Sequence, residues 1–474
     1  MWALTACHDA SSGKRSSSEV SPRIVIANQR VSVYISRHLC VSRHFGRHHH
    51  ACDHHRNVAI TIVQDVLRKG CPHIHKACLE SLCDIVRAAF SASSHTLSNL
   101  ARALDTTNAR APGAAVAVRH RVKRVDRLLG NRALQRDRTS IYAAMAQFWL
   151  HDPGSGGATQ TSLILVDWSD LNEARSAQLI RASVALQGRS LTLYEEEHTM
   201  KVAHVFAPKV HAAFLKALKA MLPSVCQLIV ITDAGFRSPW FRAIEAIGWH
   251  WVGRIRNRDM VRPQDSNNER AGGWQGAKTL YARATSKALD LGLFDYVRSH
   301  PISPRLVTIK HAPKGRHMMT LRGERTRSSH NKKKSTAESE PWLLAASIGL
   351  AHLSAEVVVA IYAQRMQIEQ AFRDTKNPRL GLGLSYSGSR STARWAALAL
   401  VASLAEFVIR LTGQCAANAK MQHDLQLTNR RKRAESSVIR VGMLLLRDAF
   451  RGFNAQAFRQ TIKQWASPHP VFSI

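Results

Sequence analysis

The amino-acid sequence predicts an α/β fold, with a strand-rich centre between two helical segments. Short apolar runs alternate with helical patterns between residues 162 and 256. Helical periodicity dominates residues 58–149 and returns in the C-terminal part of the chain. At 474 residues the chain is long enough for two or three domains, each able to bury its own core.

The N-terminal part predicts an arm followed by a helical domain. Residues 1–56 carry HFGRHHHACDHH, which lacks a recognised metal-ligand spacing, so we expect a disordered arm or translation from an upstream start codon. In residues 57–155, CLESLCDIVRAAFSAS predicts an amphipathic helix and SSHTLSNLARALDT a second, capped one. The basic segment that follows contains Arg121, Lys123, Arg124 and Arg127. This combination is typical of a small helical DNA-binding domain, with a plain helical bundle as the alternative.

Residues 156–256 predict the first part of a catalytic core. SLILVD predicts one strand, RASVALQGRSLTLYEE two strands joined at residues 187–189, and CQLIVITDAG a fourth strand. PKVHAAFLKALKAML and FRAIEAIGW predict helices, and HWVGRIR predicts the last strand. The order strand, strand, strand, helix, strand, helix, strand is that of a ribonuclease-H-like core.

The remaining sequence predicts three further segments. Residues 257–341 contain short β-like pieces and a very basic loop, which indicates a β-rich insertion. Residues 342–392 are expected to complete the core with the helix that carries Glu369, and residues 393–474 to be helical. Within them, ARWAALALVASLAEFVIRL is apolar enough for a membrane span, but Glu406 and Arg410 favour a buried helix, so no membrane is expected.

The charge of the chain predicts its class of partner, and its cysteine content predicts its cellular compartment. The chain has 67 Lys and Arg residues against 33 acidic residues, a formal net charge of +34. Such an excess predicts a polyanionic partner, and nucleic acid is the first candidate; a basic surface without a specific partner is the alternative. The eight cysteines form no CxxC pair, and the N-terminus lacks the apolar core of a signal peptide, so we expect a cytoplasmic protein.

Candidate catalytic carboxylates end two of the predicted strands. Asp167 follows LILV and Asp233 follows LIVIT, at the ends of strands where ligands of open α/β sheets collect. Mg²⁺ takes oxygen ligands from a few carboxylates plus substrate phosphate, and Glu369 on a facing helix would complete a site for two metals. Taken singly, each aspartate is more often a turn residue or a helix cap, so the prediction depends on the combination of the three carboxylates. The acidic run 195–197 also competes, but three like charges at a strand end are expected to face solvent.

The segment IYAQRMQIEQAFRDTK surrounds Glu369 with cations. On one helix, polar side chains at steps of 3, 7, 11 and 14 share a direction, and this stripe comprises Tyr362, Arg365, Glu369, Arg373 and Lys376. A neighbouring apolar stripe comprises Val357, Ile361, Ile368 and Phe372. One carboxylate among cations suggests contact with an anion, and we expect the cations to lie along DNA phosphates rather than to neutralise Glu369.

The spacing Tyr362-x2-Arg365-x3-Glu369-x6-Lys376 resembles the YREK signature of the DDE transposases of insertion-sequence family four. VDWSD, RASVALQGRSLTLYE, TDAGFRSPW, GWHWVGRIR and RMQIEQAFRDTKNPRLGLGL resemble the matching blocks of the transposon-ten group within it, and RVKRVDRLLGNRAL resembles that group's N-terminal block. The resemblance extends from about residue 60 to the C-terminus and fails over residues 1–56.

The resemblance implies a cut-and-paste transposase. Asp167, Asp233 and Glu369 would hold two Mg²⁺ ions, for which Mn²⁺ is expected to substitute. The enzyme would nick a transposon end, let the 3′-OH form a hairpin, reopen it and join the end to target DNA. The remaining members of the signature, together with a neighbouring cation, would hold phosphates near the hairpin: Tyr362, Arg365, Arg373 and Lys376.

The same resemblance implies the partners and the compartment. Double-stranded DNA, both terminal inverted repeats and target, would be bound by a dimer on paired ends, in a bacterial cytoplasm near the nucleoid. A nuclease or resolvase that cuts without joining is one alternative, and the YREK stripe argues against it. A non-catalytic DNA-binding protein is another, and the three carboxylates argue against it. Trp274 in the insertion suits stacking on a splayed base, but packing explains it equally well.

Overall fold

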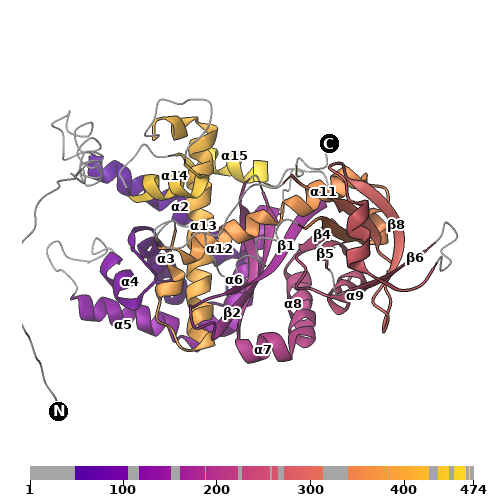
Figure 1. Ribbon diagram of the computed structural model, residues 1–474. Coiled ribbons are helices and arrows are strands. Elements are labelled where there is room, and N and C mark those ends of the chain that lie inside the picture. The colour runs from indigo at the N-terminus through magenta and orange to yellow at the C-terminus, as the bar shows by residue number, and fades with distance from the viewer. Residues whose placement is uncertain are drawn as a thin grey trace, which may run out of the picture. The chain divides into compact units, whose positions relative to one another are not determined.

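A ten-stranded mixed sheet runs through the computed structural model (Figure 1). The structure describes residues 48–104, 117–150, 161–186, 188–222, 227–256, 259–264, 272–312, 340–378, 381–425, 436–447, 453–465 and 469, without the side chains of 48–57 and 149. Cys52–Ile474 forms one unit by its internal contacts, and this unit is described below. Most of the predicted arm, residues 1–47, lies outside the described residues.

The first half of the sheet follows the predicted order of elements. Three antiparallel strands come first: β1 (Thr161–Asp170), β2 (Ala177–Ala185) and β3 (Ser190–Thr199). The chain then crosses over twice to strands that are parallel to β1, namely β4 (Gln227–Thr232) and β5 (His250–Ile255). Gly188 has a φ of +83° in the turn between β2 and β3, a conformation that glycine adopts without strain. The five predicted strands are therefore confirmed.

The second half of the sheet comes from the region predicted as the insertion and from the strand after it. β10 (Trp342–Ala346) pairs antiparallel with β5 and with β9 (Arg305–Ile309). Three further strands continue the sheet: β8 (Leu289–Tyr296), β6 (Met260–Pro263) and β7 (Gln275–Gly276). The very basic loop, residues 313–339, lies outside the described residues, and the proposed domain boundaries stay predictions.

The N-terminal segment is helical, as the periodicity predicts. It contains α2 (His48–Gly70), α3 (Lys76–Ser91), α4 (Leu97–Ala103), α5 (Val118–Leu129) and α6 (Arg132–Leu150). The hydroxyl of Thr96 accepts a 3.1 Å hydrogen bond from the backbone N–H of Asn99, which caps the start of α4. The basic segment forms α5, which buries Val125, Leu128 and Leu129 and leaves Lys123 and Arg127 exposed.

Further helices come from the middle and the end of the chain. They are α7 (Met200–Val205), α8 (Ala207–Met221), α9 (Ser238–Ala246), α11 (Ala355–Ala363), α12 (Met366–Lys376), α13 (Thr392–Asn418), α14 (Val438–Arg447) and α15 (Ala455–Trp465). Four 3₁₀ turns complete the described structure: η1 (Ala277–Arg283), η2 (Ile348–Leu350), η3 (Leu384–Tyr386) and η4 (Met421–His423). α12 packs against β1, β2 and β3, and α9 packs on β5.

α13 is the central helix of the C-terminal region. It contacts β3, α3, α6, α14 and α15, and among the described helices it is the one long and apolar enough to cross a membrane, although that apolar stretch is fully buried in the fold. Glu406 and Arg410 are 7 % and 2 % exposed. The expectation of a buried helix is confirmed, because Glu406 accepts a 2.8 Å hydrogen bond from Thr375 and its carboxylate lies 3.7 Å from the guanidinium of Arg181.

Candidate active site

Asp167 and Asp233 lie at the same level on neighbouring parallel strands. The register pairs Val166 of β1 with Thr232 of β4, so the next residue of each strand is an aspartate. One Asp233 oxygen accepts a 2.7 Å hydrogen bond from the backbone N–H of Gly235 in the turn after β4. One Asp167 oxygen accepts a 2.8 Å bond from the N–H of Trp168. The two carboxylates therefore meet at one edge of the sheet.

The expectation that Asp167 ends its strand is wrong. The parallel pairing of β1 with β4 stops at Val166, but the antiparallel pairing with β2 continues as far as Asp170 opposite Gln178. Because one neighbour is missing beyond Val166, the last residues of β1 keep an open side. Asp167 is on this half-paired stretch, and 15 % of its side chain is exposed.

The segment from Tyr362 to Lys376 is not the single regular helix that its spacing predicts. α11 ends at Ala363 and α12 begins at Met366. Between them the hydrogen bonds tighten to the i→i+3 pattern: the N–H of Arg365 donates to the carbonyl of Tyr362, and the N–H of Ile368 donates to that of Arg365. The tighter turn changes the rotation between the two helices.

Tyr362 lies beside Arg365 but does not line the pocket that Glu369, Arg373 and Lys376 share. Tyr362 is 2 % exposed, and its ring packs edge-on against Trp342 with centroids 4.9 Å apart. The predicted apolar stripe is confirmed as a buried face, and its members are all at most 8 % exposed: Val357, Ile361, Ile368 and Phe372. Glu369, Arg373 and Lys376 remain on one side of α12, where they line a common pocket.

Arg365 joins the carboxylate of Glu369 to that of Asp167. Its Nη1 atom lies 2.7 Å from Oε1 of Glu369 and 3.7 Å from Oδ2 of Asp167. The expectation that the cations leave Glu369 unneutralised is therefore wrong in this structure. The Arg365 side chain is only 16 % exposed, so water cannot solvate its charge fully and nearby carboxylates compensate it. Glu369 is one of them because it follows Arg365 by four residues, a spacing that brings side chains together on a helix.

The charges of Asp233 and Glu369 both act on Asp167. Burial and the neighbouring charge of Asp233 raise the pKa of Asp167 to about 7, although Arg365 and the N–H of Trp168 oppose this shift and Glu369 adds to it. Burial also raises the pKa of Tyr362, and Asp233 contributes in the same direction. A carboxylate that ionises with difficulty in the absence of a cation is typical of a functional site.

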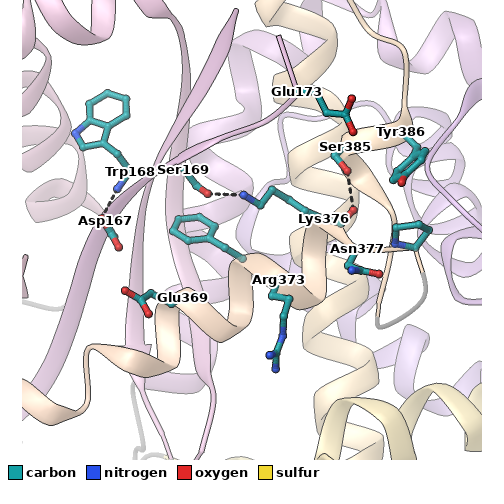
Figure 2. A pocket seen from close by; sticks show the side chains of 12 residues that line it. Asp167, Trp168, Ser169, Glu173, Glu369, Arg373, Lys376, Asn377, Ser385 and Tyr386 are labelled. Atoms are coloured by element: carbon teal, nitrogen blue, oxygen red, sulfur yellow. Dashed lines mark hydrogen bonds between the residues drawn. The ribbon is translucent and has the colours of Figure 1, made fainter. Parts of the chain in front are cut away.

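A pocket of about 720 Å³ opens beside these groups (Figure 2). It is lined by Asp167, Trp168, Ser169, Glu173, Glu369, Phe372, Arg373, Lys376, Asn377, Pro378, Ser385 and Tyr386. Lys376 crosses from α12 to β1, where its ammonium donates to the hydroxyl of Ser169 at 2.8 Å and to the carbonyl of Asp170 at 3.2 Å. Burial lowers the pKa of Lys376, whereas Arg373 is exposed. The pocket thus has carboxylates at one end and cations along its middle.

The turn between β2 and β3 holds the opposite side of α12. The guanidinium of Arg189 donates to the carboxylate of Asp374 at 2.6 Å and to the side chain of Gln370. The backbone N–H of Leu186 donates to the side-chain oxygen of Gln367 at 3.0 Å. These contacts fix the rotation of α12 about its axis, and with it the direction in which Glu369 points.

The expectation that the acidic run 195–197 faces solvent is wrong for two of its residues. Glu195 is fully buried and accepts hydrogen bonds from Arg181 at 2.7 Å and from Tyr142 at 3.0 Å. The Glu197 side chain is 1 % exposed and pairs with Arg138. Arg181 stands directly opposite Glu195 in the register of β2 and β3, and this cross-strand pairing is the sequence signal that could have revealed the buried pair.

The four N-terminal cations divide into two pairs. Arg121 donates to the carbonyls of Arg102 and Leu104 at the end of α4, and Arg124 pairs with Asp84 of α3. Lys123 and Arg127 are exposed on α5. The first pair therefore helps to join the helices, and the second pair is available to an anionic partner.

A preformed metal centre is not visible in the described part of the chain. Among those residues, no three His, Cys, Asp or Glu side chains lie close enough together to hold an ion as they stand. Arg365 instead lies between two of the three predicted ligands, Asp167 and Glu369.

Comparison with known proteins identifies the family. The sequence model of the family described as "Transposase DDE domain" matches residues 161–404, which is more than half of the chain. This chain belongs to the DDE transposase family. The prediction of a transposase, an enzyme that cleaves and joins DNA, is thereby confirmed, and the matched residues run from the start of β1 into α13.

Two further comparisons give a structural similarity and no curated relative of this transposase. A solved structure, a cryo-EM structure of a piggyBac transposase synaptic complex with hairpin DNA, is similar to it with a TM-score of 0.38 and 11 % sequence identity. That similarity covers 87 % of this chain and 79 % of the other. No curated protein matches the transposase significantly.

Proposed function

We propose that this transposase is a cut-and-paste enzyme of insertion-sequence family four, and that Asp167, Asp233 and Glu369 are its catalytic triad on a ribonuclease-H-like core. The observation that supports this most strongly is the β1–β4 register, which sets the two aspartates side by side. α12 brings Glu369 to the same edge, where one guanidinium contacts both Glu369 and Asp167. The strand order β3-β2-β1-β4-β5 agrees with the proposed core.

The chemistry of the three side chains fits divalent metal ions. All three offer hard carboxylate oxygens, the ligands that Mg²⁺ and Mn²⁺ prefer. The raised pKa of Asp167 reflects first its burial and then the negative charge of Asp233 beside it, and a bound cation would favour its ionised form. When bound, two such ions would activate the attacking oxygen and stabilise the leaving oxygen of a phosphodiester. Binding them requires Arg365 to move away from Glu369.

The reaction sequence that suits this site has four in-line displacements at phosphorus. Hydrolysis of one strand at the transposon end leaves a 3′-OH, which attacks the opposite strand, forms a hairpin and releases the flanking DNA. Hydrolysis of the hairpin regenerates the 3′-OH, which then attacks target DNA. The same three carboxylates would serve every step as ligands of the metals, because each step needs the same in-line geometry.

The cations of the pocket would bind the DNA backbone. Arg373 is exposed, and Lys376 lies in the pocket at its middle, so both would contact phosphates close to Glu369. Arg365 would exchange its two carboxylates for a hairpin phosphate. Tyr362 is buried with the Arg365 guanidinium 5.9 Å from its ring centre, so its contribution would be to position Arg365.

The remaining parts of the proposal concern partners and place. Arg121, Lys123, Arg124 and Arg127 would belong to a helical domain that binds the terminal inverted repeats, with Lys123 and Arg127 as its direct phosphate contacts. Two protomers would pair two DNA ends before joining them to target DNA. The enzyme would act at the nucleoid of a bacterial cytoplasm.

A cleavage assay tests the proposed function. A labelled duplex that carries the DNA flanking this gene is incubated with Mg²⁺ and either wild type, Glu369→Ala or Glu356→Ala. Glu356 is an exposed acid at the start of α11 and is the matched control. We expect a nick and then a hairpin with wild type and the control, and neither with Glu369→Ala, while all three bind the duplex equally well.

Three other outcomes of this assay would contradict parts of the proposed function. Nicking without a hairpin would indicate a nuclease that does not join DNA. Cleavage by Glu369→Ala at the rate of wild type would show that Glu369 is not part of the catalytic site. Tight binding without any cleavage by wild type would indicate a protein that only binds DNA.

A further inference from the structure

Arg181 stands directly beside Asp167 in the sheet. The register pairs Arg181 of β2 with Asp167 of β1 on one side and with Glu195 of β3 on the other. Residues that stand opposite each other in an antiparallel pair point to the same face of the sheet. The three side chains therefore form one row of alternating charge, on the face where Arg181 contacts α12.

The guanidinium of Arg181 contacts α12 at two points. Its Nη1 atom donates a 3.2 Å hydrogen bond to the hydroxyl of Thr375, and its central carbon lies 4.9 Å from the ring centre of Phe372. Phe372 and Thr375 follow Glu369 by three and six residues in the same helix. The place of the guanidinium therefore sets how far α12, and Glu369 with it, lies from β1 and β2.

The charge of Arg181 is enclosed in the fold. The side chain is fully buried, with the carboxylates of Glu195 at 2.7 Å and Glu406 at 3.7 Å. Its Nη2 atom is buried without a hydrogen-bond partner in the described part of the chain. The attraction within a buried ion pair often does not offset the loss of hydration, and an unpaired buried N–H is unfavourable as well. Stability alone therefore does not explain a charged residue at this place.

We propose that Arg181 is a positioning residue for the reaction: through Thr375 and Phe372 it holds α12 at the distance from β1 at which Glu369 and Asp167 act together. This inference rests on the proposed function, because it takes Glu369 and Asp167 to be ligands of the same metals. Arg181 is fully buried, so it acts through α12 and not by contact with DNA.

Substitutions of Thr375 test the proposal because they leave Arg181 and its charge in place. Thr375→Val and Thr375→Ala remove the hydroxyl, and Thr375→Ser keeps it. The matched control is Thr412→Val. Thr412 of α13 is 5 % exposed, and its hydroxyl lies 2.9 Å from the carbonyl oxygen of Val408, four residues earlier. The hydroxyl of Thr375 lies equally far from the carbonyl oxygen of Ala371.

Four properties are measured for each variant. Urea unfolding gives the stability and the conditions under which each variant is folded. Calorimetry gives the affinity for Mn²⁺ without DNA, and fluorescence anisotropy gives the affinity for the duplex that carries the DNA flanking this gene. Single-turnover cleavage of the same duplex with Mg²⁺, at saturating protein, gives the rate of the chemical step separately from binding.

Loss of the Thr375 hydroxyl should slow the chemical step without weakening DNA binding. Thr375→Val and Thr375→Ala should cleave about 10- to 100-fold more slowly than wild type and bind Mn²⁺ more weakly by a similar factor, the range found when an outer partner of a metal ligand is removed. Thr375→Ser should restore both properties, and Thr412→Val should match wild type. A purely structural role would give the two valine variants the same rate and the same Mn²⁺ affinity.

Two kinds of result would overturn the inference in different ways. If wild type cleaves the duplex and Thr375→Val equals it in rate and in Mn²⁺ affinity, or if Thr375→Ser is as slow as Thr375→Val, the contact with Arg181 does not position Glu369, but the proposed function stands. If wild type does not cleave the duplex, the proposed function fails and the inference fails with it.

Discussion

The contact between Arg189 and Asp374 gives a prediction whose size follows from the structure. The Asp374 side chain is 5 % exposed, and its carboxylate lies 2.6 Å from the Arg189 guanidinium. Removing one partner of a buried pair leaves an uncompensated charge and costs about 3–5 kcal/mol. Arg189→Ala should therefore lower the free energy of unfolding by about that amount, and it should loosen α12 so that cleavage becomes slower.

The loss of stability in Arg189→Ala should depend on pH in a definite direction. Burial raises the pKa of Asp374, and Arg189 opposes the rise. An acid whose pKa is raised by folding contributes stability at low pH and loses it as the pH rises through the folded-state pKa. Without Arg189 the pKa of Asp374 rises further, so the destabilisation should be larger at pH 8 than at pH 5.

Urea unfolding, followed by circular dichroism, measures both effects. The double variant Arg189→Ala with Asp374→Ala should be less destabilised than the sum of the two single variants, because the second change removes the charge that the first left unpaired. Arg136→Ala, whose side chain is 77 % exposed, is the control and should change stability little. If the two single substitutions change the free energy of unfolding additively and independently of pH, Arg189 does not compensate the charge of Asp374.

Three further predictions follow from the same structure. Arg365→Ala should bind Mn²⁺ more tightly than wild type without DNA, because no guanidinium then competes for Glu369 and Asp167; calorimetry that finds equal or weaker binding would contradict this. In wild type, the affinity for Mn²⁺ should fall as the pH is lowered from 8 to 6, because the pKa of Asp167 is about 7 and only its ionised form binds a cation. An affinity for Mn²⁺ that does not change with pH would show that Asp167 is not a ligand. Gly442→Ala should lower the free energy of unfolding by about 1–3 kcal/mol or more, because its Cβ would lie 1.9 Å from the carbonyl oxygen of Ile409. Gly273→Ala, which meets nothing within 4 Å, is the control in the same thermal melts.

Much of the core could be predicted from sequence because local patterns determine it. The apolar runs around Asp167 and Asp233 are long enough to form strands whatever their partners, and crossover connections make those strands parallel. Two aspartates that follow such apolar runs are therefore expected at one edge of the sheet. The pairing of α12 with that edge could be expected from its apolar face, Ile368 and Phe372.

Other features depend on contacts that sequence spacing does not encode. The break before Met366 arises from i→i+3 hydrogen bonds among residues that all favour helix, so the helical pattern does not reveal it. Glu195 is buried because Arg181 and Tyr142, from two different elements, meet it inside the fold. Tyr386 lines the pocket because a loop far from β1 in sequence returns to α12 through Leu384 and Ser385.

Mapping where a divalent metal binds on the protein tests the proposed three-carboxylate site most directly. Fe²⁺ replaces Mg²⁺ in the presence of the flanking duplex, ascorbate and peroxide generate radicals at the bound metal, and mass spectrometry locates the cuts in the chain. A single site built from the three carboxylates should give cuts close to Asp167, Asp233 and Glu369 together, all suppressed by excess Mg²⁺ and lost in Asp233→Asn. Cuts at only one of these positions, or cuts that persist unchanged in Asp233→Asn, would contradict a single site built from the three carboxylates.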